Sequence, residues 1–384
     1  MLFLGYERPD GKVGIRNYVG VLSMIVCANE VAKRIADQVD GAVAFVHSQG
    51  CGQTAPDLAI VNRTLASLGC NPNLGAVLLV SLGCESSDLE WVRNKIEKSG
   101  KIVKVINVQA EGGLPPAVAK GVGIVQELVA EISSVKRREF GLDKLCIGFK
   151  CGASDTTSGI IANPVVGHVA DLLVEKGGRI VVGETTEFIG AEHLVAMGIE
   201  DENVRERFLA AIANMENRVL ATGTDMRDGS QPSKGNKAGG LTTLEEKSLG
   251  SAAKAGKTPI RQVIDYGCQA TEPGVVMVDA PAREPELLTA LAAAGAQLII
   301  FTTGRGAPQG FPFVPVLKVT GNKQTYDRMQ AHIDVCIAPS AFSDLENASV
   351  QVFDLIARTA SGELTAAEKL NYATGDIAVM GPIV

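Results

Sequence analysis

The sequence has few aromatic residues, no excess of positive charge and no long uninterrupted apolar run. Aromatic residues make up 4% of the 384 positions, whereas 46% are hydrophobic, so we expect an ample core built mainly from Ala, Val, Leu and Ile. Lys and Arg number 36 against 43 Asp and Glu, a net charge of −7, which argues against a broad phosphate-binding face. No charge-free apolar run is long enough for a membrane span. We therefore expect neither a nucleic-acid partner nor a membrane partner.

Targeting and disulfide signals are also missing. The amino terminus, MLFLGYERPDGK, has no basic segment with a cleavage site, so we expect no secretory signal. The chain is too long to need disulfide staples, and its 8 cysteines lack the spacing of a small disulfide-bonded scaffold. We expect a cytoplasmic protein with reduced thiols.

Glycine, by contrast, is abundant. The 42 glycines are about 11% of the chain, against a usual value of about 7%. Because the apolar content is high, we expect them at sharp turns and ligand contacts rather than in disordered segments.

Short Val/Ile/Leu runs alternate with helical patterns along the chain, which is typical of parallel sheets covered on both faces. We predict an α/β fold with two doubly wound, Rossmann-like parallel-sheet domains, residues 1–135 and 140–384. The second domain includes a polar, Gly-rich loop at residues 223–257. The predicted strands are Tyr18–Val26, Ala42–Val46, Gly75–Leu82, Ile102–Val108, Leu145–Phe149, Arg179–Gly183, Val275–Asp279, Gln297–Phe301 and Val316–Val319.

Nearly every predicted strand ends in polar, reactive or glycine residues. In open α/β sheets ligands bind outside the carboxyl ends of the strands, so we expect a site between the two domains. These strand ends include Cys27-Ala28-Asn29, His47 to Gly52, Gly83-Cys84-Glu85, Lys150 to Asp155, Glu184 to Glu187 and Thr302 to Gly306.

Each strand end has a structural as well as a functional interpretation. His47 with Cys51 and Cys84-Glu85 is consistent with a divalent-metal site, although no CxxC or HExxH spacing supports it and isolated cysteines are usually buried apolar residues. Glu184, Glu187, Glu192 and His193 form a second candidate cluster, which capping of the following helix would also explain. Arg305 follows a strand and suits a carboxylate ligand. Dinucleotide and P-loop motifs are missing from the required contexts.

Several ordered motifs resemble the altronate/galactarate dehydratase family over about residues 5–340. They are Gly5 to Asn17, His47 to Cys51, Asn71-Pro72-Asn73, Leu82 to Glu85, Lys150 to Gly159, Ala162-Asn163-Pro164, Gly183 to Glu187, Gly190 to His193, Gln231 to Asn236, Lys247 to Gly250 and Phe301 to Gly306. The chain differs from the family pattern at Asp279 to Arg283 and at Ala331 to Asp334. Because of these departures, the chain also resembles a relative of the family, the catalytic subunit of sulfolactate sulfo-lyase.

The resemblance implies a metal-dependent hydro-lyase that dehydrates a sugar acid, such as altronate or galactarate, to a 2-keto-3-deoxy acid. It implies Fe²⁺, with Mn²⁺ or another divalent ion as the alternative. Family members often carry a small β-rich domain ahead of this region, so we expect a separate small β-rich subunit here. We also expect a homo-oligomer. The alternatives are a sulfolactate sulfo-lyase-type C–S lyase and, from another class, a non-catalytic small-anion binding protein.

Roles follow from what the reaction requires: a base, a cation and an acid. We expect Lys150, with a pKa lowered by burial, as the base, and Glu184 or His193 as the acid. The expected metal ligands are His47, Cys51, Cys84 and Glu85. The expected substrate-binding residues are Arg16, Asn17, Ser154, Asp155, Lys234, Asn236, Thr303 and Arg305.

Overall fold

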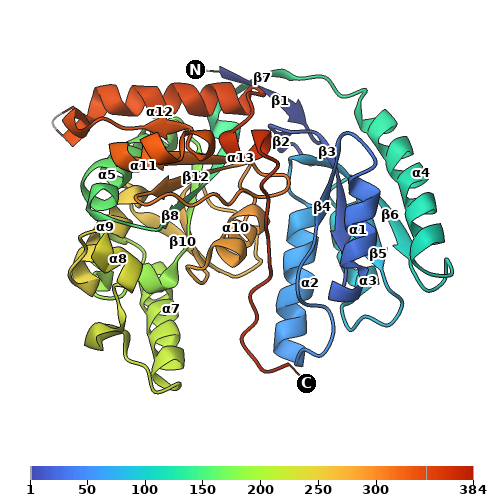
Figure 1. Ribbon diagram of the computed structural model, residues 1–384, viewed down its shortest axis with the longest axis horizontal. Coiled ribbons are helices and arrows are strands. Elements are labelled where there is room, and N and C mark those ends of the chain that lie inside the picture. Colours follow the sequence, from blue (N-terminus) through green and yellow to red (C-terminus); the bar gives the residue numbers. More distant parts are fainter. Residues whose placement is uncertain (1, 343, 384) are drawn as a thin grey trace.

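The computed structural model describes residues 2–342 and 344–383 of the chain. Two parallel sheets stand side by side with helices on both faces (Figure 1), which confirms the predicted α/β class and the two parallel-sheet units. A small antiparallel sheet, which we did not predict, joins the start of the chain to the segment between the two units. Its strands, in sheet order, are β2 (Val13–Gly14), β1 (Leu2–Glu7) and β7 (Arg138–Gly141).

The first parallel sheet has four strands. Its apolar runs are buried against α1 (Asn29–Ala36) and α4 (Leu114–Ile132) on one face, and against α2 (Ala55–Gly69) and α3 (Leu89–Glu97) on the other. The central strands are therefore the most continuously apolar, as burial on both faces requires. The strand order is β4 (Ala42–Phe45), β3 (Tyr18–Ser23), β5 (Leu74–Ser81) and β6 (Ile102–Asn107).

The second parallel sheet has seven strands. Helices α5 (Asn163–Glu175) and α12 (Leu345–Ala360) cover one face, and α10 (Glu284–Ala293) covers the other. Among the described residues, no helix is both long enough and apolar enough to cross a membrane. The strand order is β10 (Ile260–Asp265), β11 (Gly274–Asp279), β9 (Arg179–Val182), β8 (Cys146–Gly152), β12 (Leu298–Thr303), β13 (Val316–Thr320) and β14 (Val335–Cys336).

The two sheets share a hydrophobic core. Helix α10 packs against α2 between them, and one apolar cluster includes residues from both helices and both sheets (Figure 1). The carboxyl-terminal segment also joins the two units, because it runs from α13 (Ala366–Lys369) back to the first sheet. There the Asp57 carboxylate accepts hydrogen bonds from the backbone N–H groups of Met380 and Gly381, each at 2.8 Å.

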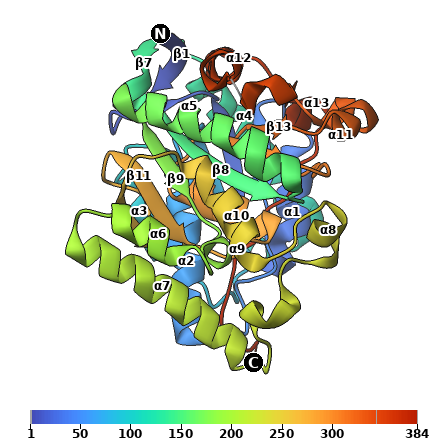
Figure 2. The same cartoon turned by 90° about the vertical axis from the view of Figure 1, so that its left-hand side faces the viewer.

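Residues 223–257 contain short helices instead of the continuous loop that we predicted. Helix α8 (Lys234–Ala238) begins after Ser233, whose side chain forms a capping box with Asn236, and α9 (Leu244–Ala252) begins after the N-cap Thr243. These caps satisfy backbone N–H groups that the polar sequence would otherwise leave to solvent. Figure 2 shows α8 and α9 on the side turned to the viewer.

Each parallel sheet has one point where its strand order reverses direction. In the first sheet, the chain leaves β3 for β4 on one side and returns to β5 on the other. In the second, it leaves β8 toward β9 and later adds β12 on the opposite side. Crevices outside the carboxyl ends of strands at such reversals are where open α/β sheets bind ligands. The fold therefore provides two candidate positions for a site.

Candidate active site

A cavity of about 300 Å³ opens outside the carboxyl ends of β8 and β12, at the reversal point of the seven-stranded sheet. This volume is at the small end of ligand pockets and suits a compact polar molecule. Its wall comes from five segments that are distant in sequence. The lining residues are Cys151, Gly152, Ala153, Ser154, Glu187, Ser233, Gly235, Asn236, Lys247, Ala282, Glu284 and Arg305.

A buried network of opposite charges lies directly beneath this cavity. The Glu184 carboxylate accepts a hydrogen bond from Lys150 Nζ at 3.1 Å and forms an ion pair with Lys254 Nζ at 2.9 Å. Lys254 Nζ lies 3.6 Å from the carboxylate of Glu187, and Lys150 Nζ lies 3.9 Å from that of Glu284. Glu184 is fully buried and the two lysines are at most 2% exposed, so each charge depends on its neighbours.

The charges set the protonation states of these groups. Burial alone would lower the pKa of Lys150, but Glu184, Glu284 and Glu187 outweigh it and raise that pKa. Burial alone would raise the pKa of Glu184, but Lys150 and Lys254 hold it below its usual value. This corrects our expectation for Lys150: its pKa is raised instead of lowered, so the amine holds its proton.

The backbone around this network is strained. Ala153 and Glu184 have φ values of 48° and 65°, a left-handed conformation that residues with a Cβ rarely adopt. Ala153 directly follows β8 and Glu184 lies two residues after β9, and the carboxyl ends of both strands form this edge of the sheet. Such outliers cluster at functional sites, where the surrounding structure holds them in place.

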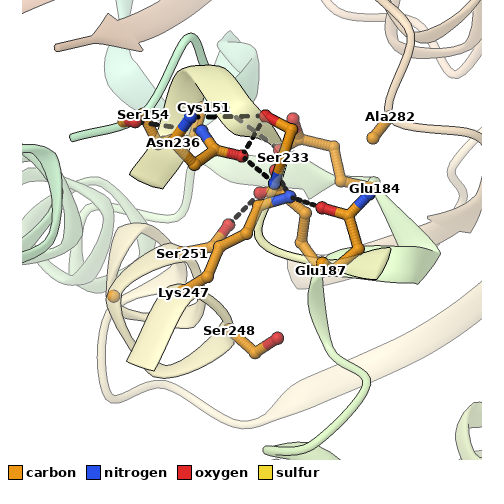
Figure 3. Close-up of polar contacts among 12 residues, drawn as sticks. Cys151, Ser154, Glu184, Glu187, Ser233, Asn236, Lys247, Ser248, Ser251 and Ala282 are labelled. Atoms are coloured by element: carbon orange, nitrogen blue, oxygen red, sulfur yellow. Dashed lines mark hydrogen bonds and ion pairs between the residues drawn. The ribbon is translucent and has the colours of Figure 1, made fainter. Parts of the chain in front are cut away.

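Two further elements complete the wall of the cavity. Asn236 on α8 donates from Nδ2 to the backbone carbonyl of Ser154 at 3.0 Å, and Arg305 donates from Nη1 to the carbonyl of Gly235 at 2.6 Å. Figure 3 shows Lys247 pointing toward Glu187, with the two charged groups 3.8 Å apart. The cavity wall therefore carries two cations, Lys247 and Arg305.

Several residues that the sequence predicted for the site lie at this cavity, and another holds one of its loops in place. Ser154, Asn236 and Arg305 line it, and Lys150 and Glu184 lie beneath it. Asp155 is buried and accepts hydrogen bonds from Ser158 and from Asn322, so its carboxylate holds the loop.

Three other predicted site residues are not among those that line the cavity. Thr303 is buried and its hydroxyl accepts from the N–H of Gly306 at 3.1 Å. Lys234 is exposed on α8. His193 is exposed on α6 (Glu192–Gly198) and does not line the cavity.

Two predicted substrate ligands, Arg16 and Asn17, lie in the framework of the molecule instead. Arg16 forms a two-pronged ion pair with Glu368, with bonds of 2.8 and 2.9 Å. Its other donors bond to the backbone carbonyls of Ile15, Thr359 and Glu363, so the guanidinium is fully used within the chain. The Asn17 amide bonds to Arg8 and to the carbonyl of Ile132.

The sequence patterns did not single out Lys254 or Glu284. They placed Lys247 in a family motif without a role and did not give Glu187 a catalytic role. Lys254 and Lys247 come from residues 223–257, whose polar composition predicted a functional loop, and of the lysines in this segment we assigned a role only to Lys234. Glu284 is the first residue of α10, and acidic residues are common there for reasons of helix capping.

The four predicted metal ligands lie at the carboxyl edge of the other sheet and do not fit a single bound ion. His47 is buried, with Nε2 2.9 Å from the carbonyl of Ser23 and Nδ1 accepting from the N–H of Gln49 at 3.1 Å. The Glu85 carboxylate is bonded to the Ser81 hydroxyl and to the N–H groups of Leu82 and Gly83. Over residues 2–342 and 344–383, no three or more His, Cys, Asp or Glu side chains are arranged to hold an ion.

Comparisons with known proteins match both halves of the chain to one family. The model of the "D-galactarate dehydratase/Altronate hydrolase, second domain" covers residues 5–133, and that of "D-galactarate/Altronate dehydratase, C-terminal" covers residues 142–382. The chain is 38% identical to the (2R)-sulfolactate sulfo-lyase subunit beta of Chromohalobacter salexigens, over 96% of this chain and 95% of that protein. It is 32% identical to the altronate dehydratase of Bacillus subtilis, over 96% of this chain and 76% of that protein.

A third relative is the galactarate dehydratase (L-threo-forming) of Escherichia coli, 31% identical over 94% of this chain and 73% of that enzyme. The named relatives are thus dehydratases and a sulfo-lyase subunit, all of which are lyases. With both family models and these identities in agreement, the chain belongs to the D-galactarate/altronate dehydratase family of lyases.

Proposed function

We propose that this chain is the catalytic chain of a lyase that eliminates sulfite from a small 2-hydroxy-3-sulfo acid, with (2R)-sulfolactate as the first candidate. The observation that carries the proposal is the near-complete match to the sulfo-lyase subunit, which extends over 95% of that protein at 38% identity. The altronate and galactarate dehydratases match at 32% and 31%, and this chain spans 76% and 73% of their lengths.

The charges on the cavity wall suit such a substrate. A sulfolactate carries two anionic groups, a carboxylate and a sulfonate, and the wall presents two cations, Lys247 and Arg305, beside the carboxylates of Glu187 and Glu284. Among the described residues, Arg305 bonds only through Nη1 to the carbonyl of Gly235, which leaves the rest of its planar donor fork for an anion. The small volume of about 300 Å³ fits a three-carbon acid.

The elimination has a defined balance of atoms and electrons. A base removes the proton from carbon 2, the C3–S bond breaks, and its electron pair leaves with sulfite. The remaining enol gains a proton at carbon 3 to give the 2-keto acid, which is pyruvate for sulfolactate. The enzyme must supply a base, and it must stabilise the negative charge that develops on the substrate carboxylate.

We assign the base to Glu187, whose carboxylate lines the cavity and is held by Lys254 and the Ser251 hydroxyl. Lys247 and Arg305 bind and neutralise the anionic groups. Lys150, which keeps its proton, acts from beneath the cavity by holding Glu184 and Glu284 in place. In this assignment Lys150 is a positioning residue, and Glu187 takes the role of base that we first expected of Lys150.

Dehydration of a sugar acid is the second candidate. It is favoured by the altronate and galactarate dehydratases among the relatives, and by the polar wall around Ser233 and Asn236, which can bond substrate hydroxyls. The same base would remove the proton next to the carboxylate, and the leaving group would be the hydroxyl on carbon 3.

A substrate comparison separates the candidates. The chain is supplied with the second subunit of the C. salexigens enzyme and is given (2R)-sulfolactate, altronate or galactarate. We expect sulfite and pyruvate in equal amounts from the first, and Glu187→Gln should lower this rate by about 10²–10⁴-fold. As the control, Glu245→Gln at an exposed position of α9 should leave the rate unchanged. A 2-keto-3-deoxy acid formed without sulfite would establish dehydration instead, and anion binding without turnover would refute both.

We further propose that the chain works with a separate subunit, the small β-rich partner expected from the sequence. Support comes from the name of the C. salexigens relative, a subunit beta whose full length this chain nearly matches. Turnover of any substrate by this chain alone, at a rate that the second subunit does not raise, would contradict this proposal.

The divalent ion that the resemblance implies also stays a prediction, with Fe²⁺ first and Mn²⁺ second. None of the residue roles assigned above depends on this ion. Treatment with a chelator, followed by addition of each ion, should abolish and then restore turnover if the prediction holds. Unchanged turnover after exhaustive chelation would contradict it.

A further inference from the structure

One face of β1 carries an exposed apolar strip. Side chains alternate between the two faces of a strand, so Leu2, Leu4 and Tyr6 lie on the same face of β1. Leu2 is 57% exposed, Leu4 is 41% exposed and Tyr6 is half-buried, whereas Phe3 on the opposite face is buried. A single exposed leucine needs no explanation. Two on one face of a strand, next to an aromatic ring, suggest a surface that another molecule covers. We call Leu2, Leu4 and Tyr6 the β1 strip.

A hollow of about 320 Å³ adjoins the β1 strip at Tyr6, which forms part of its wall. The other apolar wall residues are Val129 and Ile132 of α4 and Val135 of the segment that follows this helix. Figure 1 shows this segment crossing from the end of α4 to β7, beside β1. The hollow therefore extends the apolar surface from the small antiparallel sheet to the first parallel-sheet unit, and it has room for a side chain of a bound partner.

Two cations line this hollow. Arg137 donates from Nη1 to the carbonyl of Leu4 at 2.5 Å, and its guanidinium lies 4.7 Å from the centroid of the Tyr6 ring. Lys136 is exposed, and among the described residues neither cation forms an ion pair with an acidic side chain. Glu139, opposite Leu4 in the sheet, adds one negative charge beside the strip. The hollow is thus locally basic in a chain of net charge −7, and it suits a partner that carries carboxylates beside an apolar side chain.

The order of domains in the family indicates what covers this surface. The match to the family's second domain begins at residue 5, inside β1, so a first domain, where a relative has one, joins the fold at this strand. The match to the B. subtilis altronate dehydratase leaves about a quarter of that protein unmatched, whereas the match to the sulfo-lyase subunit beta covers 95% of it. A domain joined at β1 is held next to the β1 strip and the hollow, where its effective concentration is high.

We propose that the β1 strip and the adjoining hollow are the docking surface for the small second subunit. This inference rests on the two-subunit enzyme proposed above and adds the place where the subunit binds. The subunit takes the position that a covalently joined first domain reaches through β1. It inserts an apolar side chain into the hollow beside Tyr6 and sets a carboxylate against Lys136 and Arg137. An apolar anchor within a charged rim is the usual arrangement of a protein–protein interface.

The experiment measures binding, so its result does not depend on the reaction. Isothermal titration calorimetry follows the full chain with the second subunit of the C. salexigens enzyme. Leu4→Ser should weaken binding by about tenfold. Lys136→Glu should weaken it more at low salt than at high salt, because salt screens exposed charges. The matched controls should bind like wild type: Leu209→Ser, 38% exposed on α7 (Glu202–Leu220), and Lys104→Glu, exposed on β6.

The outcomes separate this inference from the proposal that it rests on. Circular dichroism and the thermal midpoint show that each variant is folded. Wild-type affinity in both Leu4→Ser and Lys136→Glu would overturn the docking surface and leave the two-subunit enzyme standing. A subunit that does not bind the unchanged chain would refute both. Light scattering of the chain alone tests the other occupant: a dimer that Leu4→Ser separates would show that this face pairs two copies of the chain, and would overturn the proposal.

Discussion

Glu184→Gln is the most informative single change in the buried charge network. The substitution keeps the shape of the side chain but removes the charge that two lysines share, Lys150 at 3.1 Å and Lys254 at 2.9 Å. Removing one partner of a buried ion pair typically costs about 3–5 kcal/mol, because the remaining charge stays desolvated without compensation. Two lysines lose a partner here, but Glu187 and Glu284 still lie 3.6 and 3.9 Å away. We therefore expect a loss of about 3–5 kcal/mol in the free energy of unfolding at pH 7.

The pH dependence gives a second, independent test. Glu184 has a lower pKa in the folded state than in the unfolded state, because Lys150 and Lys254 outweigh the opposite effect of burial. Its contribution is therefore fully present above the unfolded pKa of about 4.3 and is lost as the pH falls through the lower folded value. The difference between wild type and Glu184→Gln should be largest near neutral pH and should shrink below about pH 4.

Equilibrium unfolding in urea, followed by circular dichroism, measures both effects. The control is Glu206→Gln on the exposed face of α7 (Glu202–Leu220), which should stay within about 0.5 kcal/mol of wild type. If Glu184→Gln also stays within about 0.5 kcal/mol of wild type at pH 7, the buried network does not depend on this charge and our account of it is wrong.

Three further predictions concern residues whose roles the structure defines. Burial lowers the pKa of His47 to about 4, so the free energy of unfolding should fall as the pH drops from about 6.5 to about 4. In His47→Gln, the free energy of unfolding measured in urea should change less with pH over this range. Arg16→Met should destabilise the fold by about 3–5 kcal/mol without changing KM, because the guanidinium bonds Glu368 and not the substrate; a raised KM in folded protein would contradict this. Arg305→Lys should raise KM for a dianionic substrate more than kcat falls, and steady-state kinetics that show the reverse would exclude it as an anion ligand.

Local patterns in the sequence predicted most of the strands. The apolar runs at Ala42–Val46 and Ile102–Val108 became β4 and β6 with one residue less at the end, because a strand buried on both faces requires continuous apolar side chains. The helix caps were harder to recognise in the sequence. Ser233 and Thr243 are the N-caps of helices inside a segment that composition alone predicts to be a loop.

The candidate cavity was only partly predictable. Its strand-end residues could be found because carboxyl ends of parallel strands gather at one edge, which placed Lys150, Glu184 and Arg305 in the same region. Whether a basic residue binds substrate or holds the framework depends on partners far away in the chain. Arg16, for example, pairs with Glu368, which is more than 350 positions away.

The sequence by itself determined the α/β class, the parallel sheets and the family, since all three depend on periodicity and ordered motifs that are local in the chain. Only the tertiary structure decided which charges meet. It placed Lys254 against Glu184, which keeps Glu184 ionised, and it engaged both nitrogens of His47 while leaving three thiols exposed. The reason is that a buried charge takes its pKa from the groups within a few ångströms, and the fold chooses those groups from the whole length of the chain.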